Sequence, residues 1–338
     1  GIVGIFEMPN TNPLTTTPEA LEHKIKRGTE TAYTDFAYYF GGTFENSKNL
    51  PLWEKLDGVC GIKIFMGAST GNLLSATDEE VEAVVANGNR VIAVHAEDEF
   101  LMNENKKTIL KDSNDVGMHC KWRDVNSSLN ATKRVVSLAK KHNRHVHVLH
   151  ITTAEEMDYL RNHKDTATVE VLPNHLTFHA PDCYEQLGTL AQQNPPIREK
   201  HHQDALWQAI NDGTVDIVAS DHAPHTLEEK SGTYPNTPSG TPGVQTLLPV
   251  MLNHAANGKL SYERVVELMA YGPIKVHKLK NKCLISEDYD ADFTIIDPKM
   301  SHTISNAEQA SKSGWTPYDG KKIIGMPKRT IIRGQMVM

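Results

Sequence analysis

The chain has 338 residues, of which 39% are hydrophobic and 23% charged, and its formal net charge is -7 at pH 7. This balance is typical of a globular protein with ample core, and it argues against a nucleic-acid or membrane-surface partner. The four cysteines lie far apart without a Cys-x-x-Cys pair, which indicates reduced thiols and a cytoplasmic location. The length suits one large domain and a smaller one.

Strand-like and helix-like segments alternate along most of the chain. Apolar runs predict seven strands, at residues 2–8, 33–40, 60–66, 91–95, 145–150, 168–172 and 215–220. Capping residues and amphipathic patterns predict helices between them, at 18–27, after Thr77, at 125–142, after Thr153 and at 201–212. The residues after Glu99, up to about Trp122, are predicted to form an irregular polar insert before the long helix. The alternation predicts an α/β fold, a TIM-type (β/α)8 barrel that lacks its first strand.

The C-terminal region has a different pattern. Residues 291–297 and 329–338 read as strands without a crossover helix, and two isolated strands are marginal on their own. We therefore expect a barrel over residues 1–275 and, over residues 276–338, the remainder of a small β-domain. Because both sheets are short of strands, we also expect part of the protein to precede Gly1.

Four polar residues occupy comparable positions at or near strand ends, namely Lys63, His95, His150 and Asp221. An acidic side chain that ends a buried strand costs free energy unless it is paired or bound to a metal. Functional groups of such barrels lie at the C-terminal strand ends, so the four together indicate a metal site. The alternative for Asp221 is a helix N-cap.

The alternation of side chains along a strand separates the histidines of the 145–150 run. His150 is expected to share the inner face with Val146 and Val148, whereas His145 and His147 are expected to pack, with satisfied hydrogen bonds, against the helical layer.

Lys63 is the unusual member of the set. A protonated ammonium repels a metal ion, so Lys63 qualifies as a ligand only when neutral or modified, for example as a carbamate formed with CO2. The alternative is a surface or salt-bridging lysine on an edge strand. The flanking Ile62 and Ile64 favour burial instead.

Seven segments carry a family resemblance, and they occur at residues 8–13, 61–67, 94–97, 148–151, 193–198, 220–225 and 314–320. With them the chain resembles the dihydroorotases of the amidohydrolase superfamily over essentially its whole length. The Gly-Ile-Lys-Ile-Phe stretch is similar to the lysine-bridged type, which is related to hydantoinases, dihydropyrimidinases and allantoinases. The resemblance implies a hydrolase that opens and closes a cyclic amide, between dihydroorotate and N-carbamoyl-L-aspartate in pyrimidine biosynthesis.

The resemblance also implies two zinc ions. Lys63 would be the carboxylated lysine that bridges them, His95 and His150 would hold the more exposed ion, and Asp221 would bind the buried ion and move the proton. The His-x-His pair of the first barrel strand is absent from the chain and is expected upstream of Gly1. Without it, the buried ion has only Lys63 and Asp221.

By the same resemblance, the carboxylate of an anionic small-molecule substrate would bind Asn10, Asn194 and His225, with the backbone near Pro242 and Gly243 touching the ring. The residues alone leave other roles open, because both asparagines lie beside prolines and suit turns. His225 also suits a helix cap, and Glu97 and Asp98 suit supporting or solvated roles rather than metal ligands.

Two alternatives remain at this point. One is a cyclic amidohydrolase of the dihydropyrimidinase, hydantoinase or allantoinase type, which acts on a neutral ring. The other is a non-catalytic dihydroorotase-like scaffold subunit, which the missing His-x-His pair favours. The resemblance is compatible with a homodimer.

Overall fold

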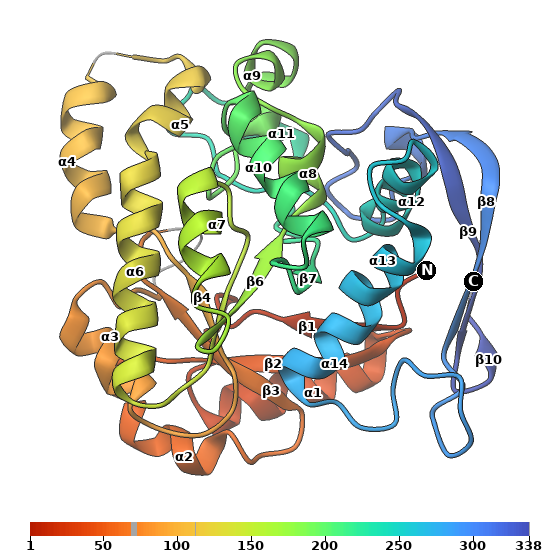
Figure 1. Cartoon of the computed structure of the whole chain (residues 1–338), viewed down its shortest axis with the longest axis horizontal. Coiled ribbons are helices and arrows are strands. Elements are labelled where there is room, and N and C mark those ends of the chain that lie inside the picture. Colours follow the sequence, from red (N-terminus) through yellow and green to blue (C-terminus); the bar gives the residue numbers. More distant parts are fainter. Residues whose placement is uncertain (69–72, 112, 338) are drawn as a thin grey trace.

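The computed structural model describes residues 1–68, 73–111 and 113–337. Its centre is a curled parallel sheet of seven strands that follow one another in chain order (Figure 1). The strands are β1 (Gly4–Glu7), β2 (Asp35–Gly41), β3 (Val59–Phe65), β4 (Ile92–His95), β5 (Val146–Val148), β6 (Ala167–Val171) and β7 (Ile217–Val218). The predicted α/β architecture with a parallel sheet is confirmed.

Helices connect the strands and surround the sheet (Figure 1). The longer ones are α1 (Pro18–Thr31), α3 (Asp78–Val85), α4 (Glu99–Ile109), α6 (Val125–Lys141), α7 (Ala154–Arg161), α10 (Lys200–Asn211) and α12 (Leu247–Ala256). The shorter ones are α2 (Leu50–Trp53), α5 (His119–Trp122), α8 (Pro173–Thr177), α9 (Asp182–Leu187), α11 (Leu227–Lys230), α13 (Tyr262–Val266) and α14 (Gly272–His277). Within the described ranges, no helix is long and apolar enough to cross a membrane.

The predicted caps form. Thr17 accepts a hydrogen bond from the backbone N–H of Ala20, and Thr77 and Glu80 make a capping box. The prediction of an irregular insert before Trp122 is wrong, because α4 and α5 lie there. In α4 only Met102 is buried, so the helix lacks the apolar periodicity by which sequence reveals helices.

The two faces of the sheet differ in character. Outward side chains such as Ile62, Ile64 and Val148 join the large core with residues of α6 and α10. Each such side chain contributes about 1.5–3 kcal/mol on burial. The inner face carries a smaller apolar cluster, which includes Tyr39 and Ala93.

The prediction of which side chains in the 145–150 run face the inside of the sheet is wrong. His147 pairs in register with Ala93, which pairs with Lys63, so His147 points inward, while Val146 and Val148 face the helices. His145 is exposed ahead of the strand. The alternation does not extend to His150, because β5 ends at Val148 and His150 has a positive φ of 39°.

A second, antiparallel sheet contains β8 (Phe293–Thr303), β9 (Lys322–Ile332) and β10 (Gln335–Met336). It lies beside α12 and near the N-terminus (Figure 1), where Thr294 Oγ1 donates to the carbonyl of Gly1 at 2.7 Å. Gly325 has φ +100°, and a Cβ there would lie 2.7 Å from Cβ of Leu252, so only glycine permits this close approach to α12.

A candidate metal centre at the strand ends

His95 and His150 face each other at the ends of neighbouring strands. Nδ1 of His95 lies 3.1 Å from Nε2 of His150, and the side chains are 1% and 5% exposed. Burial lowers the pKa of both imidazoles, which favours the neutral form that binds metals. Two nitrogens on one tetrahedral zinc lie about 3.3 Å apart when each Zn–N bond is about 2.0–2.1 Å. The observed separation therefore fits a shared ion.

Glu97 fixes the orientation of His95. Its Oε2 lies 2.8 Å from Nε2 of His95, and the Arg123 guanidinium binds the same carboxylate. Although burial opposes the charge, Arg123 and His95 hold the pKa of Glu97 well below its usual range. Because Nε2–H donates to Glu97, Nδ1 of His95 is left with its lone pair toward His150. Asp98, by contrast, caps α4 and pairs with Arg134.

Lys63 projects from β3 and is 1% exposed, which confirms that it is buried rather than on the surface. Its Nζ lies 4.2 Å from the centroid of the Phe65 ring. Burial lowers the pKa of Lys63 to about 7, and the carboxylates of Asp221 and Glu170 oppose this shift. Near pH 7 a large fraction of the amine is neutral, which is the form that reacts with CO2.

Asp221 follows β7 and has a positive φ of 42°. Burial, and then the Glu170 carboxylate, raise the pKa of Asp221 to about 7, while Lys63 opposes the shift. The N-cap alternative does not hold, because Thr226 caps the next helix, α11. Lys63 also lowers the pKa of His95 and His150, so it interacts electrostatically with all three other residues of the predicted set.

Glu170 is a member of this region that the sequence reading missed. It lies on β6, where its Oε2 is 3.3 Å from Nε2 of His147 and its Oε1 accepts from the backbone N–H of His150 at 3.4 Å. The signal was available, because Glu170 is the one charged residue in the apolar run of residues 167–172.

Two neighbouring loops hold most of the predicted substrate residues. Asn194 is buried, and its loop joins the 240–243 loop through a hydrogen bond from the Gly240 N–H to the Gln192 carbonyl at 2.9 Å. The Gly243 N–H donates to Nδ1 of His222 at 3.0 Å. Nε2 of His225 is buried without a hydrogen-bond partner among the described residues. Asn10 lies in the separate loop after β1.

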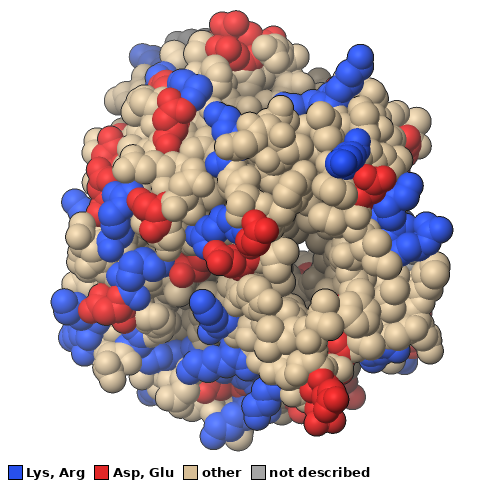
Figure 2. All heavy atoms as spheres, turned by 45° about the vertical axis from the view of Figure 1, so that its right-hand side comes forward, with Lys and Arg blue, Asp and Glu red and all other residues tan. Residues whose placement is uncertain are grey.

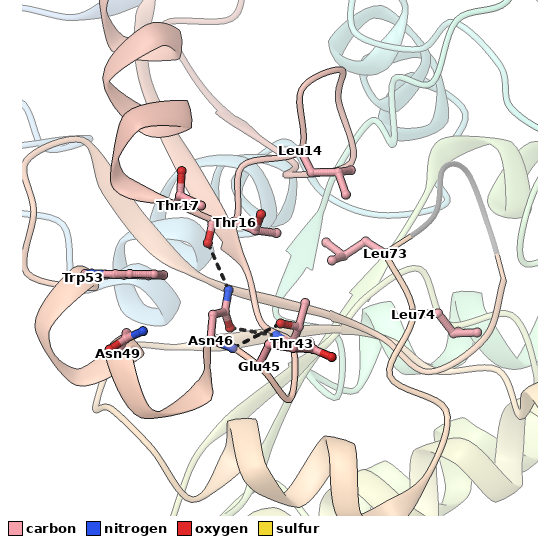
Figure 3. A pocket seen from close by; sticks show the side chains of 10 residues that line it. All are labelled: Leu14, Thr16, Thr17, Thr43, Glu45, Asn46, Asn49, Trp53, Leu73 and Leu74. Carbon is pink, nitrogen blue, oxygen red and sulfur yellow. Dashed lines mark hydrogen bonds between the residues drawn. The ribbon is translucent and has the colours of Figure 1, made fainter.

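A cavity of about 540 Å³ opens elsewhere, near the starts of α1 and α2 (Figure 3). Thr16, Thr17, Asn46 and Trp53 are among the residues that line it. No residue of the predicted metal or substrate set lines this cavity, so it is distinct from the strand-end site.

Three carboxylates form another cluster, at Asp35, Asp290 and Asp292, with ligand atoms within 4.8 Å of one another. Lys282 contacts all three, with Nζ 2.7 Å from Asp290 and 2.6 Å from Asp292, and Arg333 contacts Asp35. Each carboxylate already pairs with at least one of these two cations, so the cluster is an ion-pair network rather than a metal site. Charged side chains of both signs are also interspersed over the face in Figure 2.

The fold and this set of side chains define a class of hydrolase, and the amidohydrolase family model matches residues 10–337. The chain belongs to the amidohydrolase family. It is 33% identical to the dihydroorotase of Methanosarcina acetivorans over 351 residues, which cover 100% of this chain and 74% of that protein. It is also 33% identical to the dihydroorotase of Pyrococcus furiosus, covering 100% of this chain and 73% of that one. The resemblance to dihydroorotases of the amidohydrolase superfamily, which the sequence predicted, is confirmed.

Solved structures agree on the fold. L-Hydantoinase (dihydropyrimidinase) from Arthrobacter aurescens superposes with a TM-score of 0.94 at 29% identity, covering 100% of this chain and 77% of that one. Dihydropyrimidinase from Brevibacillus agri superposes with a TM-score of 0.91 at 22% identity and the same coverage. The predicted TIM-type architecture is confirmed.

Proposed function

We propose that the chain is a cytoplasmic, zinc-dependent dihydroorotase, which interconverts dihydroorotate and N-carbamoyl-L-aspartate in pyrimidine biosynthesis. The observation that carries the proposal is the electrostatic cluster of Lys63, His95, His150 and Asp221, in a chain that is 33% identical over its whole length to curated dihydroorotases. Such a cluster, when it holds metal, would supply the activated water that hydrolyses a cyclic amide.

Four side chains would hold two zinc ions. Lys63, as a carbamate, would bridge them, His95 and His150 would bind one, and Asp221 would bind the other. When bound, the ions lower the pKa of a water molecule and polarise the ring carbonyl. The lowered pKa of Lys63 supports carbamate formation, since only the neutral amine attacks CO2.

Asp221 would move the proton. In ring opening, water adds its oxygen to the amide carbon, the C–N bond breaks, and Asp221 transfers the water proton to the leaving nitrogen. A carboxyl held beside the reacting bond is suited to both accepting and releasing that proton. In the reverse direction the same carboxyl would protonate the hydroxyl group that leaves on cyclisation.

The substrate carboxylate would bind Asn10, Asn194 and His225, and the backbone of Pro242 and Gly243 would touch the ring. The unpartnered, buried Nε2 of His225 supports an outside ligand for this imidazole. Amide N–H groups and a histidine are suitable donors to a carboxylate.

A neutral-ring hydrolase is the second candidate, because a hydantoinase superposes with a TM-score of 0.94. A substrate panel separates the two: turnover of dihydroorotate, dihydrouracil, hydantoin and allantoin is compared in the zinc-loaded protein. We expect preference for dihydroorotate. Preferential turnover of a neutral ring contradicts the proposal.

The Asp221→Asn variant tests the proton transfer and the scaffold alternative. We expect normal folding by circular dichroism and a loss of about 1000-fold or more in kcat, since the amide can neither carry the proton nor replace the carboxylate as a zinc ligand. Asp57→Asn, at an exposed position, is the matched control and keeps activity. Near-normal rates in Asp221→Asn remove Asp221 from this role. Absence of both metal and turnover in the zinc-replete wild type favours the scaffold.

A further inference from the structure

A chain of buried polar groups leads to Asn194 from the region between α4 and α6. Nε1 of Trp122 donates to the hydroxyl of Tyr234 at 2.7 Å, and this hydroxyl lies 3.3 Å from Nδ1 of His119. Nε2 of His119 lies 2.9 Å from Oδ1 of Asn194 and 3.1 Å from the carbonyl of Gln193. All of these side chains are shielded from solvent, and His119 is 1% exposed.

The chemistry of these groups determines which is the donor and which the acceptor in each of these hydrogen bonds. The Trp122 indole is only a donor, so the Tyr234 oxygen accepts from it. Burial, and then Arg123, lower the pKa of His119 to about 3, so the imidazole carries a single proton. The Gln193 carbonyl is only an acceptor, so that proton is on Nε2, where the Asn194 side chain also faces it. Nδ1 is then an acceptor and receives the hydrogen of the Tyr234 hydroxyl.

This direction fixes the Asn194 amide. Its oxygen must face His119, because a rotated amide would place its NH2 group against the Nε2–H donor. The NH2 group of Asn194 is then directed away from His119. Within the described part of the chain, no group accepts a hydrogen bond from Nδ2 of Asn194. A donor held in this way is suited to bind an anion.

The loop around Asn194 is also anchored. Lys230 is buried, and its Nζ donates to the carbonyls of Gln192, Pro238 and Gly240 at 3.0, 2.9 and 3.2 Å. These bonds join the loop before Asn194 to the loop before Pro242 and Gly243. The amide therefore has a fixed place as well as a fixed orientation.

We propose that Trp122, Tyr234 and His119 are positioning residues that hold the Asn194 amide as a hydrogen-bond donor and thereby make the site selective for a ring that carries a carboxylate. The inference rests on the proposed function, because it assigns to Asn194 a contact with the substrate carboxylate.

Tyr234→Phe is the first test, since it keeps the ring and removes the hydroxyl. Nδ1 of His119 then loses its hydrogen-bond donor, so only the Gln193 carbonyl still favours the Nε2–H tautomer, and the Asn194 amide is held less firmly. We expect the KM for dihydroorotate to rise about fivefold to tenfold, as for partial loss of a hydrogen bond to a charged group, with kcat within about twofold. The KM of any turnover of the uncharged dihydrouracil is expected to stay unchanged.

Two variants of His119 sharpen the test. His119→Gln offers an NH2 group near the position of Nε2 and is expected to keep a KM close to that of the wild type. His119→Leu offers no donor and is expected to raise KM at least as much as Tyr234→Phe. Trp122→Phe provides an independent break in the chain should Tyr234→Phe unfold, with folding followed by thermal unfolding.

The outcomes separate the inference from the proposed function. If the wild type does not turn over dihydroorotate, both are overturned. If the wild type is active, and the folded variants lower kcat instead of raising KM or raise KM equally for charged and uncharged rings, the inference alone is overturned. Failure of His119→Gln to exceed His119→Leu in affinity also contradicts it.

Discussion

Lys63 and Lys282 both lie among carboxylates, yet the structure gives them opposite properties. Burial lowers the pKa of Lys63 to about 7, with only the more distant charges of Asp221 and Glu170 opposing it. Lys282 also loses solvent, but its hydrogen bonds to Asp290, Asp292 and Asp35 raise its pKa. Direct hydrogen bonds to carboxylates therefore keep a lysine charged and unreactive, whereas burial without them yields a neutral amine.

Lys63→Met provides the largest expected effect. The methionine fills the buried space but provides no ligand, so we expect metal content to fall and activity to drop by about 1000-fold or more. Elemental analysis and steady-state kinetics measure the two effects. Lys282→Met is the matched control and keeps both metal and activity. Full metal content and activity in Lys63→Met would show that the two lysines do not differ as described.

Glu97→Gln tests whether the carboxylate that orients His95 supports zinc binding. The amide does not neutralise the Arg123 guanidinium, and it stabilises the metal-binding tautomer of His95 more weakly than the carboxylate does. Zinc affinity is therefore expected to fall about 10-fold to 100-fold. Competition with a chelator measures it, and Glu22→Gln, at an exposed position on α1, is the control. Unchanged affinity contradicts the assigned role of Glu97.

Lys282→Met is expected to affect stability rather than chemistry. Its loss leaves Asp290 and Asp292 without their shared cation, while Arg333 still pairs with Asp35. The free energy of unfolding is therefore expected to fall by about 1–2 kcal/mol, less than for a fully buried ion pair. Urea denaturation of metal-free protein measures this change. A loss of zinc binding in this variant would mean that the network also supports the strand-end site.

The pH dependence of stability tests the lowered pKa of Lys63 directly. Between about pH 7 and pH 10, unfolded Lys63 binds a proton that the folded side chain has released. The free energy of unfolding of the metal-free wild type is therefore expected to rise with pH in this window relative to Lys63→Met. Parallel curves for the two proteins contradict the lowered pKa.

Sequence reasoning succeeded where the period of the side chains was regular. Ile62 and Ile64, which face outward, correctly predicted a buried strand, and the cap at Thr77 correctly predicted the start of α3. It failed at His147, because β5 ends too early for the alternation to reach His150. It also passed over His119, since the short α5 has no periodicity and its contacts with Tyr234 and Asn194 span more than 70 residues.

His150 and Asp221 share one more property, which sets a limit on engineering. Both have positive φ values that side chains other than glycine rarely adopt, at a cost of about 1 kcal/mol or more each. A search for thermostable variants would therefore favour glycine at these two positions, and it would select against the groups proposed to bind zinc. At these two positions, a substitution that increases stability is therefore expected to remove a proposed zinc ligand.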